Sequence, residues 1–162
     1  RDLVLGIHPP NTFKNPIYVE YSVLTAVILF IVFYIKKQML DSKALFYYEK
    51  IMILLDAIGL GAFTVIGVET AYEIGYVHHR FLLLFVGVIT GVGGGMIRDM
   101  MAQQIPFILV KQIYACASFA GAGVCIWLMP YHKSASMILG AVVVVIIRIL
   151  AATYRWDLPK IE

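Results

Sequence analysis

The stretch that decides the fold is residues 87–99, Gly-Val-Ile-Thr-Gly-Val-Gly-Gly-Gly-Met-Ile-Arg-Asp. It follows the apolar run 81–86, and the two together are long enough to cross a bilayer. Each glycine lowers helix stability by roughly 1 kcal/mol relative to alanine, so the triplet 93–95 predicts a weak point in a membrane helix. An opposite-charge pair, Arg98 and Asp99, ends the stretch. This pattern predicts a helix that bends, that packs very closely against its neighbours, or that exposes its backbone to a substance crossing the membrane.

The composition of the whole chain agrees with a membrane protein. Of 162 residues, 61% are hydrophobic and only 14% are charged, which is typical of a polytopic membrane protein and not of a soluble domain. The net charge of +3 comes from basic residues between apolar runs, and they form no stripe that would bind nucleic acid. Runs of about 20 apolar residues cross a ~30 Å hydrocarbon core. The sequence predicts an all-α protein with five such spans, at residues 17–35, 51–72, 81–101, 107–129 and 135–154.

The distribution of lysine and arginine predicts the orientation in the membrane. Most of these residues lie in the loop 36–50, in the turn 98–111 and in the tail after residue 154. The opposite turns of the complete hairpins carry only Arg80 and Lys133. Because short cytoplasmic loops are enriched in lysine and arginine, the C-terminus is expected on the cytoplasmic side, in a bacterial inner membrane.

The chain also contains an internal match at constant offset. Both copies lie in a turn before an apolar span, and three spans separate them, so the two copies face opposite sides of the membrane. This arrangement is typical of inverted-topology repeats, which place a pathway near the midplane. It also predicts that about two spans, one of them glycine-rich, precede the given sequence. The matched residues are Arg1, Asp2, Pro9 and Lys14 in the first copy and Arg98, Asp99, Pro106 and Lys111 in the second.

Two motifs carry a resemblance to a known family. Residues 93–99, Gly-Gly-Gly-Met-Ile-Arg-Asp, preceded by residues 56–63, Asp-Ala-Ile-Gly-Leu-Gly-Ala-Phe, resemble the bacterial glycine-transporter domain family. That family is similar to the trimeric intracellular cation (TRIC) channels. The resemblance implies two inverted three-span repeats plus a seventh helix, with a glycine triplet in the second span of each repeat. It implies that residues 1–50 are the remainder of repeat one, 51–133 are repeat two, and 134–162 are the final span and tail.

The resemblance also implies a function. It implies a homotrimer in membrane lipid, with a pore in each protomer lined by glycine-kinked helices and permeable to monovalent cations, chiefly potassium. The family's other description implies a secondary transporter of a small solute such as glycine. A third hypothesis is a structural membrane subunit whose glycines serve packing alone. No cofactor is expected, although bound lipid and the permeant K⁺ are expected partners.

The glycines themselves allow two interpretations. Gly87, Gly91 and Gly95 keep the four-residue spacing that lets helices approach closely, so packing explains these three. Three successive glycines point in three directions, so packing explains the block less well. A helix break is tolerated in the membrane only where the backbone is buried or faces a watery cavity. The residues predicted to form a pore-side kink are Gly91, Gly93, Gly94 and Gly95.

Charged residues within or beside the spans are candidates for the pore or its vestibule. Asp56 lies about six residues inside its span, and a charge at that depth requires a partner. Arg148 lies at a similar depth in the span 135–154, so it is the predicted partner. The alternative is a structural ion pair between helices. Arg98 and Asp99 either form a solvated boundary pair or tie down the end of the glycine-rich helix. The full set of candidates is Asp56, Glu69, Arg98, Asp99, Lys111 and Arg148.

Signatures of catalysis are missing from the sequence. It contains no Gly-x-Ser-x-Gly, no P-loop and no Cys/His set with metal-ligand spacing. The chain is therefore not expected to be an enzyme, and no metal site is predicted.

Overall fold

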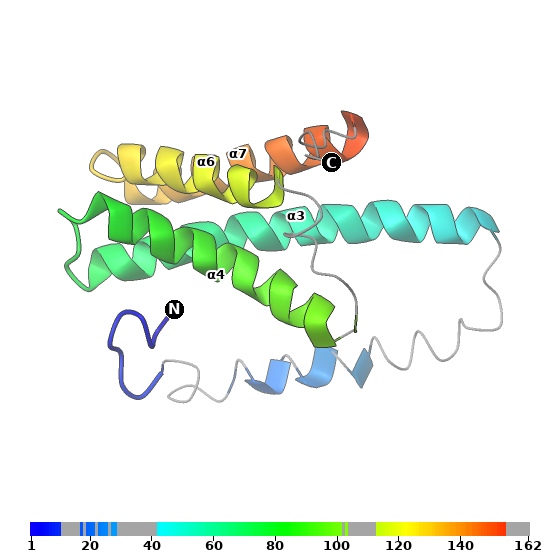
Figure 1. Cartoon of the computed structure of the whole chain (residues 1–162), viewed down its shortest axis with the longest axis horizontal. Coiled ribbons are helices and arrows are strands. Elements are labelled where there is room, and N and C mark those ends of the chain that lie inside the picture. The colour runs from blue at the N-terminus through cyan, green and yellow to red at the C-terminus, as the bar shows by residue number, and fades with distance from the viewer. Residues whose placement is uncertain are drawn as a thin grey trace, which may run out of the picture. The chain divides into compact units, whose positions relative to one another are not determined.

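The computed structural model is all-helical in the residues that it describes, and none of these forms a strand. The chain divides into two compact units, Arg1–Ile51 and Met52–Glu162. Figure 1 labels four helices within the described residues, namely α3 (Ser42–Glu73), α4 (Arg80–Met101), α6 (Ile113–Leu128) and α7 (Lys133–Tyr154). The described residues are 1–10, 17, 19–21, 23–25, 27–28, 42–101, 103 and 113–154.

The first unit begins with a turn. Ile7 N donates to Asp2 O at 2.9 Å and Leu5 N donates to Arg1 O at 3.1 Å, so residues 1–7 fold back on themselves. The described positions between residues 17 and 28 are helical, as the first predicted span requires. The remainder of that predicted span lies outside the described residues.

Three described helices are long and apolar enough to cross a membrane, namely Lys50–Glu73 of α3, Arg80–Met101 and Lys133–Tyr154. They agree with the predicted spans 51–72, 81–101 and 135–154 to within two residues. The shorter apolar helix α6 corresponds to the predicted span 107–129, whose first residues lie outside the described part of the chain.

One predicted boundary is wrong. Residues 42–50 were expected to belong to a loop, but α3 already begins at Ser42. Hydropathy marks the part of a helix that fits the hydrocarbon core, whereas a helix can continue beyond the core into water. The charged residues of this segment therefore end the predicted membrane span without ending the helix.

The turn from α3 to α4 is set by Gly75. Its φ of +106° is a backbone conformation that glycine adopts without steric cost. Tyr76 N donates to Ala71 O at 3.3 Å and Gly75 N donates to Tyr72 O at 3.1 Å. This pair of bonds is the Schellman motif, which satisfies the last carbonyls of a helix. The turn reverses the chain so that α4 runs back along α3.

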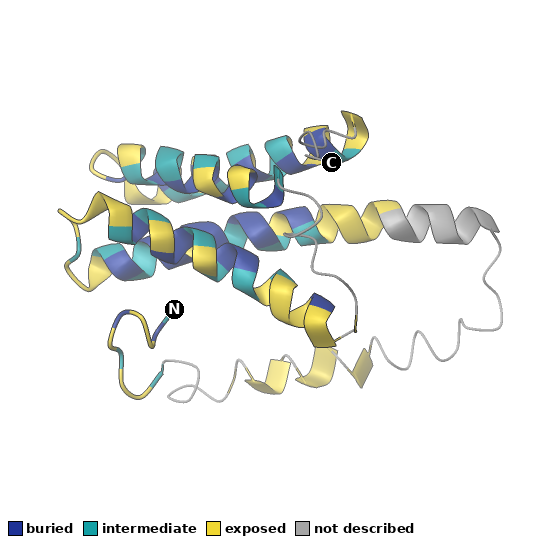
Figure 2. Cartoon of the chain, viewed as in Figure 1, coloured by how far each residue is buried: buried dark blue, intermediate teal, exposed yellow. Residues whose placement is uncertain are grey.

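Within the second unit, small residues bring the helix backbones close together. Gly87 of α4 faces Thr64 of α3, where an added Cβ would lie 3.1 Å from the carbonyl oxygen. An added Cβ at Gly61 of α3 would lie 2.8 Å from the Ala141 carbonyl oxygen of α7. Such contacts replace the hydrophobic driving force that helices lack inside a lipid bilayer. The buried residues accordingly line the surfaces where these helices meet (Figure 2).

A buried hydroxyl pair also joins α3 to α6. Thr64 Oγ1 donates to Leu60 O at 2.7 Å and lies 2.7 Å from Ser118 Oγ, so Ser118 donates to Thr64. Both side chains are fully buried. Interhelical hydrogen bonds of this kind contribute about 0.6 kcal/mol to membrane-protein stability.

We expect Thr64→Val to lower the free energy of unfolding by about 0.6 kcal/mol, because it keeps the shape and leaves Ser118 without its acceptor. Equilibrium unfolding in mixed detergent micelles, followed by circular dichroism, measures this loss. Thr70→Val is the matched control, since the Thr70 hydroxyl donates only to Ile66 O of its own helix. Equal losses in the two variants would contradict an interhelical contribution.

Candidate functional site

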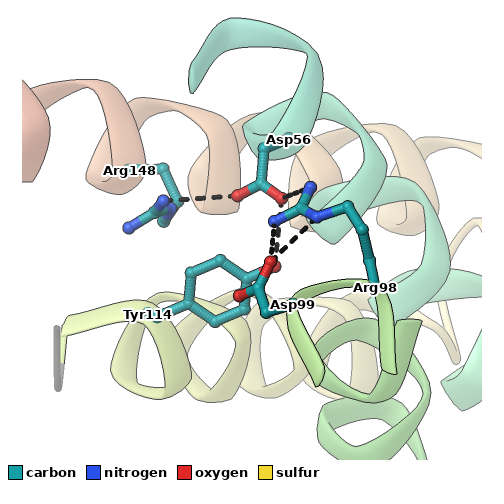
Figure 3. A network of polar contacts seen from close by, with 5 residues as sticks. All are labelled: Asp56, Arg98, Asp99, Tyr114 and Arg148. Atoms are coloured by element: carbon teal, nitrogen blue, oxygen red, sulfur yellow. Dashed lines mark hydrogen bonds and ion pairs between the residues drawn. The ribbon is translucent and has the colours of Figure 1, made fainter. Parts of the chain in front are cut away.

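The candidate site is a polar network at one end of α4, centred on Asp56 (Figure 3). Asp56 lies on α3, and each of its carboxylate oxygens accepts a hydrogen bond from a different arginine. Arg98 Nη1 lies 2.8 Å from Oδ1, and Arg148 Nη2 lies 3.4 Å from Oδ2. The predicted ion pair between Asp56 and Arg148 is therefore confirmed, and Arg98 is a second, closer partner.

Arg98 connects two carboxylates. Besides Asp56, it contacts Asp99 Oδ1 through Nη2 at 2.9 Å and through Nε at 3.0 Å. The Asp99 side chain is 5% exposed, whereas that of Arg98 is 43% exposed. A solvated boundary pair would leave both groups in water, so the geometry instead favours the reading in which Arg98 ties the end of α4 to α3.

Tyr114 of α6 completes the network. Its hydroxyl donates to Asp56 Oδ1 at 3.4 Å, and the Arg148 guanidinium carbon lies 4.5 Å from the centre of its ring. A guanidinium at this distance from an aromatic ring gains a cation–π attraction. Buried Arg148 Nε has no hydrogen-bond partner among the residues that the structure describes, and the Tyr114 ring packs against the same guanidinium. The network thus joins α3, α4, α6 and α7.

The charges of the network balance. Two arginines face two carboxylates, and a balanced, hydrogen-bonded set can be accommodated within membrane-spanning helices. Within the described residues, the network therefore presents no excess negative charge that would attract a cation. Among the described residues there is also no group of three or more His, Cys, Asp or Glu side chains that could hold a metal ion.

Of the other charged candidates, Glu69 lies apart from this network. Its Oε1 is 2.8 Å from Lys133 Nζ at the start of α7, and Lys133 also bonds to Glu73. Glu69 and Asp56 therefore do not share one ion site, as their helical spacing predicts. Lys111 lies outside the described residues.

Sequence reasoning missed two participants, Tyr114 and the link from Arg98 to Asp56. The available signal was depth, because Arg98 ends one span at about the level where Asp56 begins the neighbouring antiparallel one. The same depth argument that paired Asp56 with Arg148 applies equally to Arg98. Tyr114 lies about seven residues inside the predicted span 107–129, but a tyrosine carries no charge that would call for a partner at that depth.

The glycines of α4 separate into two sets. An added Cβ at Gly91 would overlap Thr64 Oγ1 and lie 3.1 Å from Leu60 O, and one at Gly95 would lie 2.6 Å from the Tyr114 hydroxyl. These two positions serve close packing, as does Gly87. At Gly93 and Gly94, in contrast, an added Cβ would meet no atom within 4 Å.

The glycines at residues 93–95 do not interrupt α4. The pore-side kink at Gly91, Gly93, Gly94 and Gly95 stays a prediction, because a continuous helix can still bend. α4 is continuous from Arg80 to Met101, so the triplet does not release backbone carbonyls from the helical hydrogen bonds. Contacts on one side of the helix explain the continuity, because packing at Gly91 and the tie through Arg98 hold the segment at both ends. The space beside Gly93 and Gly94 therefore lies at the surface of a continuous helix and not at a gap in its backbone.

The first copy of the repeat has the same local contact. Arg1 Nε lies 2.7 Å from Asp2 Oδ1, just as Arg98 Nε bonds to Asp99 Oδ1. In both copies the aspartate side chain is at most 10% exposed and the arginine is more exposed. Arg98 and Asp99 lie in the last turn of α4 and not in the loop that the sequence predicts. Equivalent contacts at matched positions nevertheless support the interpretation of the two segments as copies of one motif.

Comparisons with known proteins place the chain in a family. The model of the glycine transporter family matches residues 53–130. A UPF0126 membrane protein of Vibrio cholerae is 32% identical over 161 residues, which are 98% of this chain and 63% of that protein. YvgT of Bacillus subtilis, another UPF0126 membrane protein, is 30% identical over 99% of this chain and 74% of its own length. A UPF0126 membrane protein of Deinococcus radiodurans is 32% identical, and the chain spans 57% of it.

Solved structures show the same fold. A prokaryotic TRIC channel crystallised in 0.5 M KCl superposes with a TM-score of 0.79 and 30% identity, over 97% of this chain and 75% of that one. The trimeric intracellular cation channel orthologue from Rhodobacter sphaeroides gives 0.76 and 25% identity, over 96% and 75%. The chain thus spans less than two thirds of the first curated relatives and about three quarters of these channels. The chain belongs to the UPF0126 membrane proteins, and it shares the fold of TRIC channels.

Proposed function

We propose that this chain belongs to a monovalent cation channel that is permeable to potassium, with one pathway in each protomer of a homotrimer. The observation that carries the proposal is the fold. Over 97–99% of its length the chain superposes on TRIC cation channels at 30–31% identity, with TM-scores of 0.75–0.79. The proposal places the protein in the bacterial inner membrane with its C-terminus in the cytoplasm, where its role is transport and not catalysis.

The open positions on α4 support a pathway along this helix. At Gly93 and Gly94 an added Cβ would meet no atom within 4 Å, whereas at Gly87, Gly91 and Gly95 it would collide with the neighbouring helices α3 and α6. In this proposal α4 forms one wall of the pathway, and the missing side chains widen it at the triplet. A continuous helix keeps its carbonyls bonded internally, so selectivity depends on the width of the pathway and on the charges at its ends.

The network around Asp56 is proposed to hold α4 in place. Arg98 fixes the end of α4 directly after the open glycines, and Arg148 and Tyr114 hold Asp56 from the other side. A wall that must keep a fixed width needs such a support. Asp56 and Asp99 then act on permeation by positioning the helix, because arginines already neutralise their charges.

The second candidate function is transport of a small solute such as glycine. The observation that favours it is the match of residues 53–130 to the glycine transporter family model. A zwitterion needs donors for its carboxylate and acceptors for its amine near the midplane. Among the described residues, Thr64, Thr90 and Ser118 are hydroxyls near the middle of the helices, but Thr64 and Ser118 are fully buried and bonded to each other. A structural subunit without a pathway is the third hypothesis.

We expect single-channel currents from the purified protein in planar bilayers under a potassium gradient, and a reduced unitary conductance in Gly94→Leu. The new side chain has room in the fold but narrows the proposed pathway. Gly59→Leu is the matched control, because an added Cβ at Gly59 of α3 also meets no atom within 4 Å.

The two arms of the experiment separate the candidate functions. A conductance reduced by Gly94→Leu and unchanged by Gly59→Leu supports a pathway along α4. Absence of current together with saturable glycine uptake into proteoliposomes would overturn the channel and favour the transporter. Absence of both activities would leave packing as the function of the glycines.

A further inference from the structure

A cavity of about 410 Å³ lies at the opposite end of the second unit from the Asp56 network. It is formed where α3 turns into α4 and α6 turns into α7, so it is at the ends of membrane-crossing helices. Neither the proposed pathway nor the Asp56 network uses it. Its lining includes His78, Arg80, Leu83, Gly123, Ile126 and Trp127.

The polar part of this cavity carries the positive charge of Arg80, beside the imidazole of His78. Arg80 and His78 are both exposed, and neither makes an ion pair or a side-chain hydrogen bond within the described part of the chain. None of the residues lining the cavity carries a carboxylate. The two carboxylates nearest in sequence, Glu69 and Glu73, are bonded to Lys133. An unpaired guanidinium in such a site suits a group with two acceptor oxygens, such as a phosphate.

The rest of the cavity is apolar and has space. Leu83 and Ile126 form its wall, and an added Cβ at Gly123 would meet no atom within 4 Å. Trp127 is 72% exposed at the end of α6. An exposed tryptophan at a helix end is typical of the membrane interface, where lipid headgroups lie. The cavity therefore combines an anion-binding edge with an apolar wall at headgroup depth.

We propose that this cavity binds an anionic phospholipid, with the lipid phosphate at Arg80 and His78 and an acyl chain along the α4 and α6 wall. Charge complementarity selects the headgroup, because basic pockets between membrane helices bind anionic lipids. The apolar wall selects a lipid over a free anion. A bound lipid would fill the space beside Gly123 and hold the turn between α3 and α4.

Trp127 provides a direct probe of this site. The given sequence has two tryptophans, Trp127 and Trp156. The probe is a variant in which Trp127 is the single tryptophan, made by Trp156→Phe together with phenylalanine at every tryptophan outside the given sequence. The protein is reconstituted in phosphatidylcholine vesicles that contain either brominated phosphatidylglycerol or brominated phosphatidylcholine as quencher. We expect brominated phosphatidylglycerol to reach half-maximal quenching at a mole fraction about fivefold lower than brominated phosphatidylcholine does. One contact between a basic side chain and an anionic headgroup contributes about 1 kcal/mol, which corresponds to this factor.

Two variants and two controls test the assignment. Arg80→Gln is expected to abolish the preference by removing the phosphate contact, and Gly123→Leu is expected to abolish it by filling the cavity with the charges intact. Lys50→Gln makes the same change of charge at a residue that does not line the cavity, and Gly59→Leu makes the same change of size at another open glycine. Both controls are expected to keep the preference.

Three outcomes would overturn the proposal. Equal quenching by the two lipids, or a preference that survives Arg80→Gln, would mean that the cavity does not select an anionic headgroup. Loss of the preference on addition of inorganic phosphate would identify a soluble anion as the ligand. A Trp127 that neither lipid quenches would mean that a second protein copy covers the cavity.

Discussion

Asp56→Ala is expected to lower the free energy of unfolding by about 3 kcal/mol, because removing one partner of a buried ion pair leaves the other charge uncompensated. Arg148 has a side chain only 7% exposed, and Asp56 is its single ion-pair partner among the described residues. Arg98 would lose its contact with α3 and keep the one with Asp99. Equilibrium unfolding in mixed micelles measures the loss.

Glu69→Ala is the matched control for this variant. Glu69 is a carboxylate on the same helix, but its side chain is 25% exposed and its partner Lys133 is 46% exposed. Exposed ion pairs contribute little to stability, so the control should lose far less than Asp56→Ala. Similar losses at the two positions would show that burial of the Asp56 network has no energetic consequence.

A double variant separates the destabilisation caused by an unpaired arginine from the stabilisation contributed by the ion pair. Asp56→Ala with Arg148→Met removes both charges and keeps an apolar side chain of similar length under Tyr114. Replacing a buried ion pair by apolar residues is often close to neutral. We therefore expect the double variant to recover most of the stability lost in Asp56→Ala, and a loss equal to the sum of the single losses would contradict this account.

The sequence predicts well how deep each charged residue lies in the membrane. It predicts poorly which side of each helix faces the rest of the protein. Asp56 and Arg148 were paired because both lie inside apolar spans at similar depth, and the structure contains this ion pair. Hydropathy gave no comparable signal for the buried face of α3. Residues 52–55 are apolar and all exposed although they point in four directions, so no periodicity distinguishes the protein-facing side.

The glycine triplet shows the same limit. Propensity predicts that residues 93–95 weaken the helix, but a tertiary contact at each end keeps α4 continuous. A glycine allows close packing where another helix lies against it, and leaves free space where none does. The position of the neighbouring helices decides between the two, and the local sequence does not contain it. Spacing alone assigned Gly87, Gly91 and Gly95 to packing, and an added Cβ would indeed collide at each of them.

The contact between α6 and α7 gives the second large expected effect. An added Cβ at Gly121 would lie 2.7 Å from the Gly140 carbonyl oxygen, and one at Gly140 would lie 2.9 Å from the Gly121 carbonyl oxygen. Each glycine thus admits the backbone of the other helix. An added Cβ at Gly121 would also overlap the Val144 side chain, which is fully buried. Because a rotation of Val144 would leave the backbone collision in place, relief requires the helices to separate and to lose the packing around Val144.

We expect Gly121→Ala to lower the free energy of unfolding by about 2 kcal/mol, within the usual cost of overpacking a core. Gly123→Ala is the matched control on the same helix, since its Cβ would meet no atom within 4 Å. There alanine should stabilise the helix by up to roughly 1 kcal/mol, because it is the better helix former. Two identical substitutions, two residues apart, should therefore change the unfolding midpoint in opposite directions. Changes of the same sign would mean that helix propensity, and not the close approach of α6 and α7, determines stability at this contact.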